Sequence, residues 1–61
     1  MNGEILKRFM RKQVKLVKEG YALYGMITEV SDDCLIFESK DAVSAISLDV
    51  VDAVILISDK G

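Results

Sequence analysis

The side chains that most enzymes use for catalysis are scarce in this sequence. Histidine is absent, and Cys34 is the one cysteine among 61 residues. Most zinc sites need several His or Cys ligands, and Ser–His–Asp catalysis needs a histidine. Cys34 lies in an apolar stretch without a nearby base, which favours a buried, inert thiol. The acids Asp32, Asp33, Glu38 and Asp41 lack the regular oxygen spacing of a calcium loop and are interpreted as turn residues. We expect no catalytic residue, no metal site, no cofactor and no enzymatic activity.

Two tyrosines could bind a ligand by stacking. Tyr21 and Tyr24 lie three residues apart in a stretch typical of a strand, so they fall on opposite faces. Sites that stack nucleobases combine aromatic rings with cations. Because no cation alternates with these tyrosines, we favour packing or a subunit contact for them.

The charged residues are segregated along the chain. The net charge is −2, but residues 1–18 carry six bases and one acid, for +5, and residues 19–61 carry two bases and nine acids, for −7. The candidate polyanion-binding residues are the bases Lys7, Arg8, Arg11 and Lys12. Such asymmetry is typical of a basic docking face, and equally of a solvated helix face.

Residues 3–12 have the spacing of an amphipathic helix. Asn2 is a plausible N-cap, and Glu4 in the first turn suits the helix dipole. The apolar positions in this range repeat at helical spacing, and the bases occupy a different arc of the same helix.

From residue 13 onward the pattern changes to that of short strands. Glu19-Gly20 is a turn signal, and Gly25 within a strand predicts a bulge, a sharp bend or a close backbone approach. The expected strands begin at 13 and then span 21–30, 34–38, 43–48 and 53–58, with a 3₁₀ turn as one interpretation of 49–52. In the fourth strand we expect Val43 and Ala45 to face inward, with Ile46 or Leu48 left open.

These elements predict a single domain over 1–61 of the mainly β class. A short N-terminal α-helix, at about 3–12, precedes a strongly bent five-stranded antiparallel barrel of the SH3-like or OB kind, at about 13–58. The longest apolar run, Ala53 to Ile57, is far shorter than the ~20 residues of a membrane helix, and no targeting segment is visible. We expect a soluble, cytoplasmic protein with no membrane partner.

The size of the chain predicts self-association. A domain of about 60 residues buries only roughly 60% of the surface of its unfolded chain, and 51% of this chain is hydrophobic. The last strand is apolar on both faces and is expected at a sheet edge, where natural proteins cover such strands. The expected interface residues are Val43, Ala45, Val54, Ile55, Leu56 and Ile57. In the alternative, Ile55 and Ile57 pack under the helix.

The pattern resembles that of the Sm/LSm/Hfq superfamily, in which a short helix precedes a bent five-stranded barrel. The resemblance covers about Ile5 to Ile57. The first Sm motif resembles the run Glu19-Gly20, Leu23, Gly25, Ile27, Val30, Ser31–Asp33 and Cys34-Leu35-Ile36. The second resembles Ile46-Ser47-Leu48-Asp49-Val50-Val51, followed by Val54.

This resemblance implies the Sm fold and a homo-oligomeric ring of six or seven subunits, in which the fourth strand of one subunit pairs with the fifth strand of the next. It also implies binding of single-stranded RNA around the pore. The family's base-binding positions correspond to Ser31, Asp33, Leu35, Ser47, Leu48 and Asp49. None of these is aromatic or basic, and acids there repel phosphate, so they do not favour the family's uridine pocket. They predict an acidic pore lining.

One nucleic-acid feature of the family has a counterpart here. Hfq-like proteins carry an arginine cluster on the N-terminal helix, at the rim of the ring, and the bases at positions 7, 8, 11 and 12 resemble it in location and composition. The leading hypothesis is a ring that binds RNA weakly, with little base specificity, through this basic rim. The alternative is an Sm-fold oligomeric scaffold or protein-interaction module that binds no nucleic acid.

Overall fold

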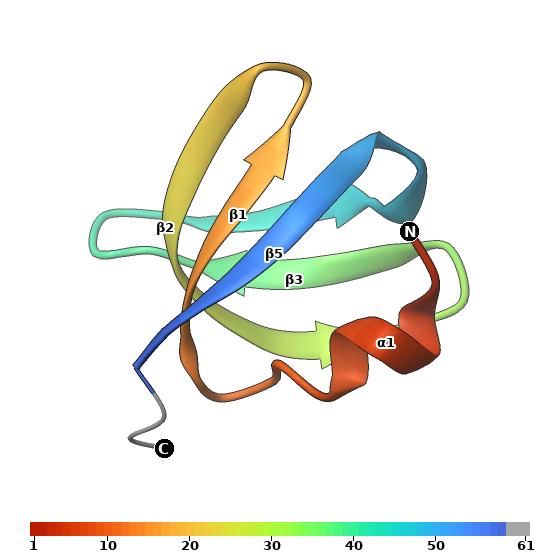
Figure 1. Cartoon of the computed structure of the whole chain (residues 1–61), viewed down its shortest axis with the longest axis horizontal. Helices are drawn as coiled ribbons and strands as arrows, with labels where there is room; N and C mark the ends of the chain where they lie inside the picture. The colour runs from red at the N-terminus through yellow and green to blue at the C-terminus, as the bar shows by residue number, and fades with distance from the viewer. Residues whose placement is uncertain (59–61) are drawn as a thin grey trace.

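The computed structural model describes residues 1–58, which form one short helix and five strands (Figure 1). In chain order the elements are α1 (Gly3–Lys7), β1 (Gln13–Lys18), β2 (Tyr21–Val30), β3 (Cys34–Glu38), β4 (Val43–Ser47), the 3₁₀ turn η1 (Leu48–Val50) and β5 (Val51–Ser58). The predicted mainly β class, with an N-terminal helix and five antiparallel strands, is confirmed. The predicted domain also includes residues 59–61, which lie outside the described residues.

The five strands form one sheet in the order β4-β3-β2-β1-β5, and all neighbours are antiparallel. Within the sheet, the chain therefore starts at β1, runs strand by strand to the edge at β4, and then crosses to β5 at the opposite edge, beside β1 (Figure 1). Within residues 1–58 no ladder joins β4 to β5, so the sheet is not closed. Each of these two strands keeps one edge without a strand partner.

A tight hairpin joins β1 to β2. The pair Lys18↔Tyr21 closes a two-residue loop in which Glu19 and Gly20 have φ values of 48° and 84°. Two successive positive φ values define the hairpin turn whose twist matches that of the strands. The Glu19 N–H donates to Asp52 Oδ2 at 3.1 Å, which ties the turn to β5. The turn predicted at Glu19-Gly20 is confirmed.

Gly25 marks a close approach of β2 to β3. A Cβ at this position would lie 2.2 Å from the backbone oxygen of Glu38, so any larger residue would force the two strands apart. The β2–β3 ladder shifts register between Ile27 and Glu29, which places the irregularity of the strand after the glycine. Of the three features predicted for Gly25, the structure has the close backbone approach.

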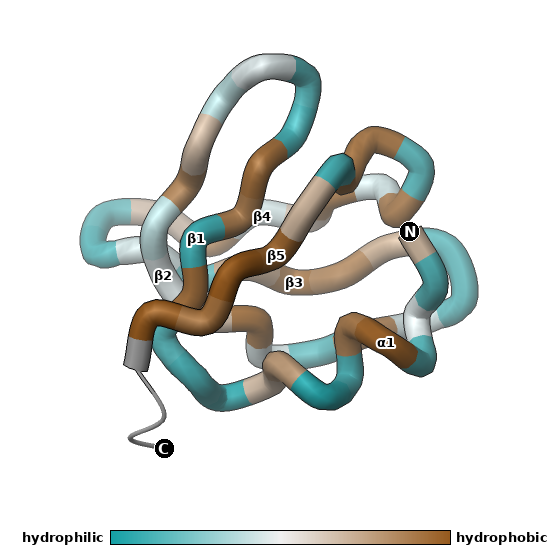
Figure 2. Tube along the Cα trace, in the orientation of Figure 1, coloured by the Kyte–Doolittle hydropathy of each residue, from teal (hydrophilic) through white to brown (hydrophobic). Residues whose placement is uncertain are grey.

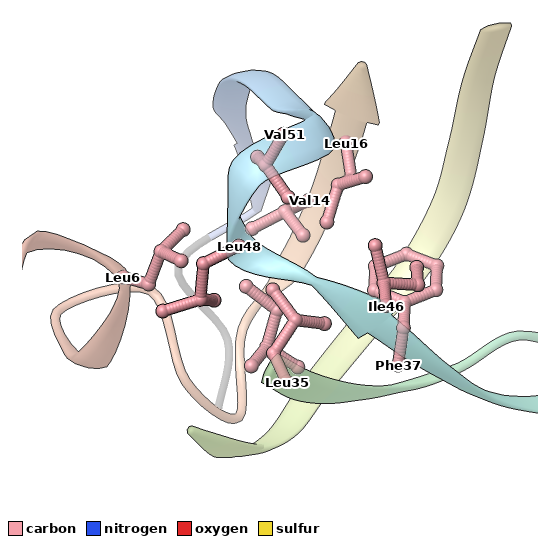
Figure 3. Close-up of a cluster of buried hydrophobic side chains, with 9 residues drawn as sticks. Leu6, Val14, Leu16, Leu35, Phe37, Ile46, Leu48 and Val51 are labelled. Atoms are coloured by element: carbon pink, nitrogen blue, oxygen red, sulfur yellow. The ribbon is translucent and has the colours of Figure 1, made fainter. Parts of the chain in front are cut away.

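The core lies inside the curved sheet and beneath α1, and residues from both halves of the sheet meet there (Figure 3). Its buried side chains are Leu6, Val14, Leu16, Ile27, Leu35, Phe37, Ile46, Leu48 and Val51. For the fourth strand, the prediction that Val43 and Ala45 face inward was wrong, whereas Ile46 and Leu48, which were left open, are both buried. Ile46, paired with Leu35, points inward, whereas Val43 and Ala45 are exposed. Strand pairing decides this, because a strand has only two faces and the partner of Leu35 must share the core face.

The helix is shorter than predicted. It ends at Lys7, and Arg8 is its C-cap. Arg11 has a φ of 64°, and its N–H donates to the carbonyl of Ile27 on β2 at 2.9 Å. In a helix over 3–12, Lys7 and Arg11 would be like-charged neighbours four residues apart, as would Arg8 and Lys12. The turn separates these charges and gives the backbone a partner on β2.

The last strand carries the largest run of exposed apolar residues. Ile55, Leu56 and Ile57 are 49%, 44% and 56% exposed, and Figure 2 shows this end of β5 as a continuous hydrophobic stretch. The alternative in which Ile55 and Ile57 pack under the helix is therefore wrong. Val54, by contrast, packs against the core, and β5 begins at Val51, two residues before its predicted start.

Candidate functional site

The basic segment, residues 7–12, is an anchored turn with bases on its outside. Lys7 ends α1, and the other three bases lie between α1 and β1. Phe9 and Met10 pack against the core, and Met10 forms a parallel bridge with Ile27. These two apolar residues hold the turn to the sheet, and Lys7, Arg8 and Arg11 are exposed beside them, whereas Lys12 is half-buried. The predicted single helical arc of bases is replaced by a basic turn along the end of the sheet.

The bases of the basic segment differ in their exposure and in whether they have an ion-pair partner. Lys7 Nζ lies 3.4 Å from Glu4 Oε1 in a solvent-exposed pair, which contributes little because water and salt screen it. Arg8 and Arg11 are exposed, and within residues 1–58 neither guanidinium takes part in an ion pair. Lys12 is half-buried and has an interaction of its own. Two arginines are thus available to phosphate oxygens, which guanidinium groups bind in a bidentate manner.

The two loops that the sequence resemblance assigned to base binding lie next to each other in the structure. The N–H of Leu48, at the start of η1, donates to the carbonyl of Asp33 at 3.0 Å. The N-terminal ammonium donates to the carbonyl of Leu48, which brings the chain start to the same place. Leu35 and Leu48 are 1% and 6% exposed, so both are core residues and neither side chain can contact a ligand.

The remaining four positions offer hydroxyls and carboxylates. Ser31 Oγ donates to the carbonyl of Cys34 at 3.0 Å, and Ser47 Oγ accepts from the N–H of Asp49 at 3.3 Å, so both hydroxyls stabilise turns. Asp33 and Asp49 are exposed. None of these four side chains is aromatic or basic, and the cation beside them is the N-terminal ammonium, which is bound to the Leu48 carbonyl. Asp33 and Asp49 give this part of the surface an acidic character, as the sequence predicts.

Cys34 is half-buried, which differs from the fully buried thiol that the sequence favours. Its Sγ lies 3.3 Å from Ser31 Oγ, and this contact belongs to the turn before β3. Across the described part of the chain, no group of three or more His, Cys, Asp or Glu side chains could hold a metal ion. In the same residues, no helix has the length and hydropathy needed to cross a membrane.

The two free sheet edges carry the predicted interface residues. Val43 is 69% exposed on β4, where Ala45 is exposed as well, and Ile55, Leu56 and Ile57 are exposed on β5. Beside β4 is a hollow of about 240 Å³, bounded by residues of β1, β2, β4 and η1. Each free edge therefore has both unpaired backbone groups and exposed apolar side chains. This combination favours the addition of a strand from another chain.

The structure also shows a site that the sequence reasoning missed. Lys15 and Tyr24 are direct cross-strand partners, and Lys15 Nζ lies 6.0 Å from the centroid of the Tyr24 ring. No cation alternates with the tyrosines along their own strand, and this cation comes from the neighbouring one. Tyr24 also lines a hollow of about 380 Å³ beside the β3–β4 turn. The signal that could have found this pair is the two-residue turn at 19–20, because it fixes the register that places Lys15 opposite Tyr24.

Comparison with known proteins gives no relative of this chain: no family model, no curated protein and no solved structure matches it.

Proposed function

We propose that this protein is an Sm-like subunit of a homo-oligomeric ring, in which β4 of one copy pairs with β5 of the next. The observation that carries the proposal is the pair of open, apolar edges at the two ends of one bent sheet. The proposal also assigns the bent sheet to the SH3-like barrel of the Sm fold.

The two edges differ from each other, and this determines the kind of assembly. Contact between two different surfaces of identical subunits is heterologous, and it forms a closed ring when the rotation between neighbours closes. Such pairing would cover the exposed side chains of Ile55, Leu56 and Ile57 on one side and that of Val43 on the other. It would also supply partners for the free backbone groups of both edges. The family resemblance adds the expected ring size of six or seven.

The proposed ligand is single-stranded RNA, bound weakly through the basic segment. Arg8 and Arg11 are the exposed cations that support this, and a ring would repeat them around its rim, so that several weak phosphate contacts act together. Contacts to phosphate carry no base information, so specificity from this segment is expected to be low.

The experiment that tests the RNA proposal measures binding of polyU and of a mixed-sequence RNA over a range of salt concentrations. We expect binding at low salt and a steep loss as salt rises. Arg8→Glu should weaken binding of both RNAs and reduce the dependence of affinity on salt. Lys18→Glu changes the net charge by the same amount, but at the end of β1 away from the basic segment. It should change the affinity and its salt dependence much less. Absence of binding at low salt would refute the RNA function, as would equal effects of the two variants.

A second candidate function is an Sm-like scaffold or protein-interaction module that binds no nucleic acid. The acidic loops at Asp33 and Asp49 favour it, because they replace the side chains with which the family holds a base. The ultraviolet absorbance ratio of the purified protein separates the two functions. Co-purified RNA raises the ratio of absorbance at 260 nm to that at 280 nm, whereas a scaffold has the ratio expected from its two tyrosines and two phenylalanines.

A further inference from the structure

The hollow beside the β3–β4 turn differs in its chemistry from two other hollows on the surface of the described residues. Its volume of about 380 Å³ is at the lower end of the range for small-molecule sites. Its lining residues are Gln13, Tyr24, Gly25, Met26, Glu38, Ser39 and Lys40. The hollow beside β4 and the one between α1 and the β2–β3 turn have no aromatic residue in their lining. An aromatic ring and a nearby cation are combined at this hollow alone among the three.

Tyr24 provides a stacking surface that the protein itself does not use. Its side chain is 60% exposed although its ring is large and mostly apolar. Lys15, its cross-strand partner, has its Nζ 6.0 Å from the ring centroid and is not among the residues that line the hollow. Met26 adds a half-buried apolar side chain beside the tyrosine. Base–aromatic stacking tolerates every base, because each base has a π face.

The polar residues of the hollow suit a base edge better than a phosphate. Glu38 and Lys40 have opposite charges, so the lining has no net charge to attract an anion. The Gln13 side chain is exposed and forms no hydrogen bond within residues 1–58, and its amide can both donate and accept. Ser39 Oγ donates to the carbonyl of Ala42 at 3.3 Å and retains its capacity to accept. These polar groups could bind a flat ligand that has hydrogen-bond donors and acceptors along one edge.

One lining residue of the hollow directly follows the basic segment in the chain. Gln13 follows Lys12, so a base bound at the hollow would lie next to the end of the basic segment. We propose that this hollow is a nucleobase-binding site, in which a base stacks on Tyr24 and its edge meets the amide of Gln13. The site lies apart from the loops at Asp33 and Asp49. This inference rests on the proposed RNA function for its ligand class, and it adds a second kind of contact that depends on bases.

The test compares short single-stranded RNA of mixed sequence with an abasic strand that has the same number of phosphates. For the wild type, we expect the abasic strand to bind more weakly. Tyr24→Ala should weaken binding of the normal strand by about 5- to 150-fold and leave the abasic strand unaffected. Tyr24→Phe keeps the ring and should restore most of the binding. Tyr21→Ala removes a similarly exposed tyrosine outside the hollow and should have little effect.

Affinity and its salt dependence together distinguish base binding at the hollow from phosphate binding by the basic segment. Tyr24→Ala should lower affinity without changing the salt slope, whereas Arg8→Glu should lower the slope. If Tyr24→Ala binds the normal strand like the wild type, the hollow is not a base site, and the basic segment can still bind RNA. If no strand binds, a titration with adenosine monophosphate and ribose 5-phosphate decides. Shifts of the Gln13 and Gly25 amide resonances with the nucleotide alone would support the hollow, and their absence would overturn it.

Discussion

Replacement of Gly25 by alanine is expected to be the most damaging small change in this chain. The new Cβ would lie 2.2 Å from the backbone oxygen of Glu38, whereas ordinary contacts begin at about 3.4 Å, so the two backbones must separate by about 1.2 Å. A side chain could rotate away from such a contact, but a backbone oxygen cannot. The movement would loosen the adjacent ladder pair Met26↔Glu38 as well.

The expected loss of stability in Gly25→Ala can be estimated from the steric clash and from the weakened ladder. Overpacking costs about 1–3 kcal/mol, and weakened ladder hydrogen bonds add about 1 kcal/mol each. We therefore expect Gly25→Ala to lower the free energy of unfolding by about 3 kcal/mol, out of roughly 3–9 kcal/mol for a domain of this size. The corresponding fall in Tm is about 12 °C or more.

Two other glycines provide matched controls for the assay, which is denaturant unfolding followed by circular dichroism. Gly3→Ala meets only ordinary contacts in α1 and should leave stability unchanged or slightly raised. Gly20→Ala meets open space but a φ of 84°, and should cost about 1–2 kcal/mol. The expected order of stability is Gly3→Ala, Gly20→Ala, Gly25→Ala. A Gly25→Ala protein as stable as Gly20→Ala would refute the close approach of β2 to β3.

Three further outcomes are expected. Phe37→Ala removes a side chain that is 2% exposed and should cost about 3–5 kcal/mol in denaturant unfolding, and a loss below 1 kcal/mol would contradict its place in the core. Leu56→Glu puts a charge on the free edge of β5 and should reduce the solution mass, whereas Tyr21→Glu, away from both edges, should not; equal masses would argue against edge pairing. Arg8→Glu with Arg11→Glu should abolish most RNA binding at low salt, and unchanged binding would exclude the basic segment.

Most of the fold could be predicted from local patterns. The change from helical to alternating spacing at residue 13 located the start of β1, and the turn residues separated the strands close to their observed limits. The Glu19-Gly20 turn and the special role of Gly25 followed from backbone conformation and from the lack of a side chain. These features depend on residues near one another in the chain, so one sequence is enough to find them.

The errors concern features that depend on contacts between distant residues. The end of α1 is determined by the carbonyl of Ile27, which accepts the Arg11 N–H across the fold. The facing of β4 depends on the partner of Ile46 in β3, because Val43 and Ala45 are as apolar as many core residues. The hollow at Tyr24 forms where the β3–β4 turn approaches β2, and no local pattern brings Lys40 to that place.

The central claim is that the two free edges of the sheet join copies of this chain into a ring. The most direct measurement is the solution mass of the unmutated protein, determined by light scattering at the outlet of a sizing column. A chain of 6.8 kDa should give a particle of six or seven times that mass. A stable species of 6.8 kDa at the same concentration would contradict the account.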